Sequence, residues 1–125
     1  MKTIKKQFGD LGEQIAQKYL KKNKYQILEQ NFQKPWGEID IIAKLGNDII
    51  FIEVKTKSAG ISDEYGLPEE EVNYWKQKKL IRTAETYLME KDFSENVNWK
   101  IDVIAILLYW QTRKAKLRHL KNAVY

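Results

Sequence analysis

Two carboxylates and a lysine, Asp40, Glu53 and Lys55, are the residues of this 125-residue chain whose types and spacing could carry out chemistry. Carboxylate oxygens are the ligands that hard cations such as Mg²⁺ and Mn²⁺ prefer, and a nearby lysine can stabilise developing negative charge. Other metal sites are excluded, since the chain has no cysteine and only one histidine, His119. Any metal chemistry must therefore rest on carboxylates.

The three residues lie on two predicted strands, Glu38 to Lys44 and Asp48 to Thr56. Between these strands, Gly46 and Asn47 form a Gly-Asn pair flanked by β-branched runs, which favours a hairpin with a two-residue turn. In that register the residue numbers of each directly opposed pair sum to 93. The register is therefore specified down to the single residue.

This register places Asp40 opposite Glu53 and Glu38 opposite Lys55, all on one face of the sheet. The two carboxylates would lie roughly 5 Å apart at Cβ, where like charges are unfavourable. A divalent cation between them would remove the repulsion. A structural network, in which Lys55 neutralises one acid and Asp40 is solvated at the strand end, fits the spacing equally well.

Helices must cover this hairpin, because both of its faces are largely apolar. The hydrophobic spacing predicts the order helix, three strands, helix, two strands in a single domain, residues 1–125. The fold class is α/β, a mixed sheet with helices on both faces. The remaining elements are a helix from Ile4 to Asn23, a strand from Tyr25 to Asn31, a turn from Gln33 to Gly37, a loop from Lys57 to Pro68, a helix from Pro68 to about Lys91, and strands from Trp99 to Tyr109 and from Lys116 to Val124.

The charge of the chain is modestly basic, with 22 Lys and Arg against 17 Asp and Glu, a net charge of +5 and a pI near 9.3. This balance is consistent with a polyanionic partner such as nucleic acid, although many proteins without such a partner are equally basic. The sequence shows no signal peptide, and its longest apolar run, Val103 to Leu108, is far shorter than a membrane span. We expect a soluble, cytoplasmic protein with no membrane contact.

The hairpin motif Asp-x(12)-Glu-Val-Lys matches the PD-(D/E)XK nuclease motif. With its surroundings it resembles the YraN-like family, which is described as predicted endonucleases related to archaeal Holliday junction resolvases and restriction enzymes. The resemblance extends from about Gly9 to Ala123, and it rests mainly on Gly12-Glu13, Gly37 to Ala43, Phe51 to Lys55, Gly66-x-Pro68 and His119-x-x-Asn122-Ala123.

The resemblance implies a restriction-endonuclease-like fold and hydrolysis of DNA phosphodiester bonds, including those of branched or structured DNA. Asp40 and Glu53 would hold Mg²⁺ or Mn²⁺, with the backbone carbonyl of Val54 and with Glu13 completing the shell. Lys55 would orient water or stabilise the transition state. Without the resemblance, Glu13 would be interpreted as an exposed helix residue. A homodimer is compatible with this family, whereas the chain's three arginines give little support to arginine-based recognition of junctions.

Four further residues are candidates for nucleic-acid binding: Lys57, Lys76, Lys79 and Trp36. Lys76 lies on an otherwise apolar helix stripe, from which it could reach a phosphate or lay its stem along the core edge. Tryptophans are more often core residues than stacking platforms. We also interpret Asp102 as a structural hydrogen-bonding group and His119 as a surface or core residue. A non-catalytic nucleic-acid-binding or assembly module remains the alternative function.

Overall fold

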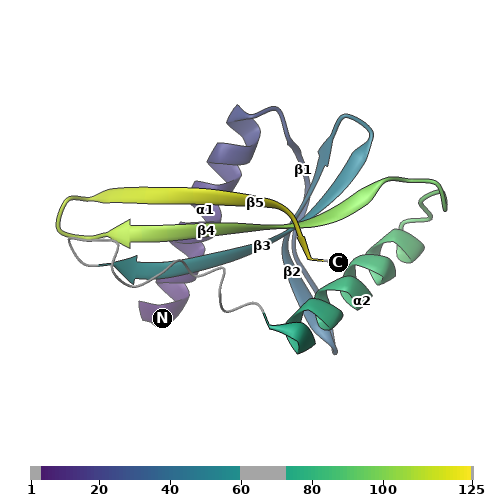
Figure 1. Ribbon diagram of the computed structural model, residues 1–125, viewed down its shortest axis with the longest axis horizontal. Helices are drawn as coiled ribbons and strands as arrows, with labels where there is room; N and C mark the ends of the chain where they lie inside the picture. Colours follow the sequence, from purple (N-terminus) through teal and green to yellow (C-terminus); the bar gives the residue numbers. More distant parts are fainter. Residues whose placement is uncertain (1–3, 60–72, 125) are drawn as a thin grey trace.

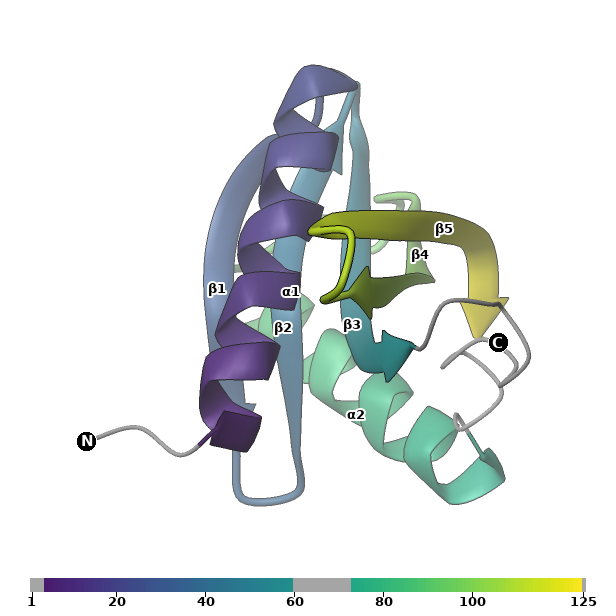
Figure 2. The same ribbon diagram turned by 90° about the vertical axis from the view of Figure 1, so that its left-hand side faces the viewer.

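Five strands form one mixed sheet in the order β1-β2-β3-β4-β5, and a helix covers each face (Figures 1 and 2). This computed structural model describes residues 4–59 and 73–124. The elements follow the predicted order and confirm the mixed α/β fold. They are α1 (Ile4–Lys22), β1 (Gln26–Lys34), β2 (Gly37–Leu45), β3 (Asp48–Ala59), α2 (Tyr74–Glu90), β4 (Trp99–Tyr109) and β5 (Lys114–Val124).

Two separate cores lie on the two faces of the sheet. On one face, Ala16 and Leu20 of α1 pack against side chains such as Ile50 and Ile52 of β3. On the other, α2 packs against the opposite side chains of the same strands, among them Phe51. β3 and β4 are parallel, so the chain must cross back over the sheet between them, and α2 lies in that connection.

The β2–β3 hairpin has the predicted register. Every observed pair sums to 93, and Gly46 supplies the positive φ of the turn, +62°. The ladder ends at the pair Ile41–Ile52, however, and β2 then separates from β3. Asp40 and Glu53 would form the next pair, so both lie where the two strands part.

Strict alternation of side chains fails in β2 near this point. Ile39 and Ile42 are three residues apart, yet both pack in the α2 core, whereas Ile41 packs in the α1 core. The partner strand is also irregular here, because Asn31 of β1 has a left-handed φ of +53°. Simple alternation therefore does not hold along this part of β2, although Glu38, Asp40 and Glu53 still line one cavity.

Several predicted boundaries need correction. β3 continues to Ala59 because β4 pairs with it along its whole length, so Lys57 lies in a strand and not in a loop. β1 extends to Lys34, which shortens the following turn to residues 35 and 36, and β5 starts at Lys114. The predicted helix start at Pro68 lies outside the described residues. The helix that the structure describes begins at Tyr74.

The cause of that helix start is the N-cap residue Asn73. Its backbone is extended (φ −84°, ψ 175°), and its side chain accepts a hydrogen bond from the Lys76 N–H at 2.9 Å. Because this bond satisfies an amide of the first turn, it fixes where α2 begins. It also sets the position of Lys76 on the helix.

Two glycines let the helices approach the sheet beside the parted strands. A Cβ added to Gly12 of α1 would lie 1.8 Å from Thr56 Oγ1 of β3. A Cβ added to Gly37 of β2 would lie 2.5 Å from Thr83 Oγ1 of α2. Both helices therefore come closer to the strands than a larger residue at either position would permit.

Candidate active site

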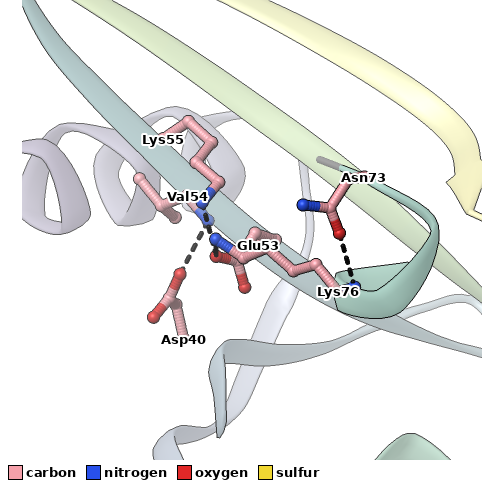
Figure 3. A network of polar contacts seen from close by, with 6 residues as sticks. All are labelled: Asp40, Glu53, Val54, Lys55, Asn73 and Lys76. Carbon is pink, nitrogen blue, oxygen red and sulfur yellow. Dashed lines mark hydrogen bonds and ion pairs between the residues drawn. The ribbon is translucent and has the colours of Figure 1, made fainter. Parts of the chain in front are cut away.

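Asp40 and Glu53 stand at the fork between β2 and β3. The Val54 backbone N–H donates a hydrogen bond of 2.8 Å to Asp40 Oδ2 (Figure 3). The Asp40 carboxylate thus takes the place of the missing ladder partner, which satisfies an amide that the parting of the strands would leave unpaired. The Asp40 side chain therefore bridges the two strands at the point where they part.

The fork opens toward both faces of the sheet. On the α1 side, Asp40 and Glu53 line a cavity of about 580 Å³ together with Glu13 and Lys57. On the α2 side, the same two carboxylates line a cavity of about 210 Å³ with Lys76. A ligand can therefore reach the pair from either side.

Two lysine ammonium groups converge on Glu53. Lys55 Nζ and Lys76 Nζ each lie 3.4 Å from Glu53 Oε1 (Figure 3). Lys55 comes from β3, two residues beyond Glu53, and Lys76 comes from the first turn of α2. The structure places the Lys76 ammonium at the carboxylate pair, so this side chain does more than cover the core edge.

Burial dominates the electrostatics of the two acids. Desolvation, reinforced by the charge of Glu53, raises the pKa of Asp40 to about 8, although the Val54 hydrogen bond opposes this shift. Desolvation also raises the pKa of Glu53, against the lowering effect of Lys76. The pair therefore resists carrying two negative charges, which is the property that a bound cation would relieve.

Glu13 reaches the same cavity from α1 and is half-buried. Burial raises its pKa, with smaller contributions from nearby acids that include Glu38 and Glu53. Among the residues that the structure describes, no three carboxylate or histidine side chains gather closely enough to form a metal site by themselves. Two carboxylates nevertheless suit Mg²⁺, which keeps several water ligands and commonly uses one or two protein carboxylates.

The sequence comparisons assign the family. A family model described as "Uncharacterised protein family UPF0102" matches residues 12–106. The chain belongs to the UPF0102 family. A UPF0102 protein of Clostridium acetobutylicum is 45% identical over 123 residues, covering 98% of each chain. One of Clostridium beijerinckii is 42% identical over 123 residues, covering 98% of this chain and 97% of its own length.

The UPF0102 match includes Asp40 and Glu53 at the fork, and also Glu13 on α1 and Lys76 on α2. Lys57 and Lys79 were predicted to bind nucleic acid, and they line the larger and the smaller cavity, respectively. Trp36 lies apart from both cavities, and the Arg82 guanidinium covers one face of its ring at 4.2 Å. Its Nε1 is buried and has no hydrogen-bond partner within the described residues.

This UPF0102 protein has a second polar network, whose residues were not predicted to contact one another. Asp102 Oδ2 lies 2.7 Å from His119 Nε2, and the Asn122 N–H donates to Asp102 Oδ1 at 2.7 Å. On its other side, His119 Nδ1 lies 2.8 Å from the Tyr19 hydroxyl of α1. The hydrogen-bonding role predicted for Asp102 is confirmed. Of the two positions expected for His119, surface or core, the structure shows the core, with a side chain that is 4% exposed. A lone aspartate in an apolar strand was the sequence signal.

No helix in the described part of this UPF0102 protein is long and apolar enough to cross a membrane.

Proposed function

We propose that this protein is an endonuclease that requires a divalent cation and hydrolyses phosphodiester bonds in DNA. The observation that carries the proposal is the pair of half-buried Asp40 and buried Glu53 at the fork, with Lys55 beside it and an open cavity in front. Together with the PD-(D/E)XK resemblance, this arrangement supports phosphoryl chemistry better than a purely structural role.

Each residue of the fork has a task in such a reaction. Asp40 and Glu53 would hold Mg²⁺ or Mn²⁺, with Glu13 and the Val54 carbonyl as further ligands, directly or through water. The cation would polarise the attacking water and neutralise charge on the scissile phosphate. Lys55 would then turn its ammonium from Glu53 to a phosphate oxygen and stabilise the transition state there. Lys76 and Lys79 would hold neighbouring phosphates of the DNA backbone.

A second candidate is a nucleic-acid-binding module that does not turn over. The observation in its favour is that Lys55 and Lys76 already pair with Glu53, while Asp40 accepts the Val54 hydrogen bond. Such a network is neutralised without any cation. The two functions differ in what the removal of Lys55 should do.

The deciding experiment incubates metal-stripped protein with linear, single-stranded, flapped and four-way DNA, with and without Mn²⁺. We expect cleavage of at least one substrate only when Mn²⁺ is present. Lys55→Ala should abolish cleavage while DNA binding persists, because Lys55 acts on the reacting phosphate. Lys44→Ala removes an exposed lysine of β2 outside the site and is the matched control.

Two results would overturn the proposal. Cleavage by pure protein in excess chelator would rule out the cation-dependent mechanism. Metal-independent DNA binding without cleavage of any of the four substrates would favour the non-catalytic module.

A further inference from the structure

Residues of α1 and of the turn that joins β4 to β5 line a second groove. Figure 2 shows this turn next to α1. The groove has a volume of about 550 Å³. Leu11 and Ile15 of α1 and Leu108 of β4 form its apolar lining, and the side chains of the turn, Trp110 and Arg113, stand at its edge. The proposed cleavage reaction uses none of these residues.

One contact between side chains links the lining of the active-site cavity with that of the groove. Phe8 of α1 lines the cavity that contains Asp40 and Glu53. The same Phe8 ring meets the Trp110 ring edge-to-face, with 4.9 Å between centroids. Phe8 therefore connects the wall of the active-site cavity with the Trp110 edge of the groove.

The turn between β4 and β5 carries the exposed aromatic and cationic side chains of the groove. Trp110 is 51% exposed although it is a large aromatic residue. Arg113 has a left-handed φ of +54°, and its N–H donates a 3.4 Å hydrogen bond to the Trp110 carbonyl, which closes the turn. Arg113 and the adjacent Lys114 are both exposed and line the same groove as Trp110.

A partly exposed indole with two cations in the same groove fits an unpaired nucleotide. Bases stack on aromatic faces, and Arg or Lys holds the neighbouring phosphates. In a duplex, base pairs are stacked on each other and cannot offer their faces to Trp110. An apolar peptide would match the lining but would leave Arg113 and Lys114 without counter-charge.

We propose that this groove binds an unpaired strand of the nucleic acid next to the bond that is cut. The inference rests on the proposed function, and it defines the substrate class as DNA with a single-stranded segment adjoining the scissile phosphate. The binding of a single strand to the groove can be tested without any cleavage.

The test measures fluorescence anisotropy of a labelled single strand of about 12 nucleotides, a length within the range of known single-strand sites. The buffer contains chelator, so that no cleavage occurs, and a duplex of equal length is measured in parallel. We expect the single strand to bind more tightly than the duplex. Trp110→Ala should weaken single-strand binding about 10-fold, the effect of losing one stacked base.

Trp75→Ala is the matched control, because Trp75 is 72% exposed and lies on α2. This variant should bind the single strand like the wild type. Arg113→Gln, which alters an exposed turn residue, should lower the slope of log K against log salt by about 0.7, the value for one lost contact to a single strand. Quenching of tryptophan fluorescence by the strand, absent in Trp110→Phe, provides a readout that does not depend on folding of the alanine variant.

Equal loss of binding in Trp110→Ala and Trp75→Ala would overturn the inference, as would tighter binding of the duplex. The remaining alternative is that the groove binds a second copy of this chain, which sedimentation tests. A wild-type dimer that dissociates in Trp110→Ala would support this alternative and overturn the inference. The two proposals fail separately. Single-strand binding without cleavage refutes only the nuclease, whereas cleavage unaffected by Trp110→Ala, together with unchanged binding, refutes only the groove.

Discussion

Asp40→Asn is the substitution that distinguishes a cation site from a structural network. Asn keeps the shape of the side chain, and its amide oxygen can still accept the Val54 hydrogen bond. The change removes only the capacity for negative charge. Any difference in stability between the two proteins therefore reports on the ionisation of Asp40.

The size of the effect follows from the raised pKa. Between its ordinary value of 3.8 and about 8, Asp40 is ionised in the unfolded chain and protonated in the folded one. The folded protein then binds one more proton, so the free energy of unfolding falls by about 1.4 kcal/mol per pH unit. This contribution is complete below pH 3.8 and is lost as the pH rises through about 8. From about pH 6 to pH 8 the wild type should lose roughly 2 kcal/mol that Asp40→Asn retains.

The assay is urea unfolding of both proteins across that pH range in chelator, repeated with Mn²⁺. Mn²⁺ at about a hundred times its dissociation constant should stabilise the wild type by about 2.7 kcal/mol and should not stabilise Asp40→Asn. Glu95→Gln, at an exposed acid in the turn before β4, is the control and should follow the wild type. Parallel pH curves for wild type and Asp40→Asn would refute the burial argument. A less stable Asn variant, with neither protein responding to Mn²⁺, would establish the structural network.

Three further substitutions test other parts of the molecule. In DNA binding with Ca²⁺ present, Lys76→Ala should lower the slope of log K against log salt by about 0.9, one duplex phosphate contact; an unchanged slope would confine this lysine to its ion pair. Asp102→Ala should cost about 2–4 kcal/mol in urea unfolding, because it leaves part-buried donors of His119 and the Asn122 backbone without an acceptor. Gly12→Ala should destabilise by about 1–3 kcal/mol through its clash with Thr56, and a double-mutant cycle with Thr56→Ala should recover part of this loss.

The parts of the fold that local chemistry controls could be predicted from the sequence. The Gly46-Asn47 turn specifies the β2–β3 register, which is correct over the whole observed ladder. The facing positions of Asp40 and Glu53 follow from that register. The end of the ladder at Ile41–Ile52 could not be predicted, because no signal in the hairpin sequence marks it.

The start of α2 as described depends on one local signal. Asn73 caps this helix with a side chain that favours such a position, whereas the start predicted at Pro68 lies outside the described residues. The meeting of Lys76 with Glu53 depends on the path of α2 across the sheet, which no local pattern contains. The same holds for Tyr19 and His119, which are 100 residues apart.

The opening of the fork toward both faces has a mechanical consequence. α1 and α2 pack in separate cores on opposite sides of the sheet, so we expect local opening of either helix to leave the other in place. Glu13 of α1 and Lys76 of α2 both face the carboxylate pair. An ion or phosphate bound there would join the two helices through the sheet. We therefore expect Mn²⁺ with DNA to slow hydrogen exchange in α1 and α2 by the same factor, which would make two independently opening layers one cooperative unit.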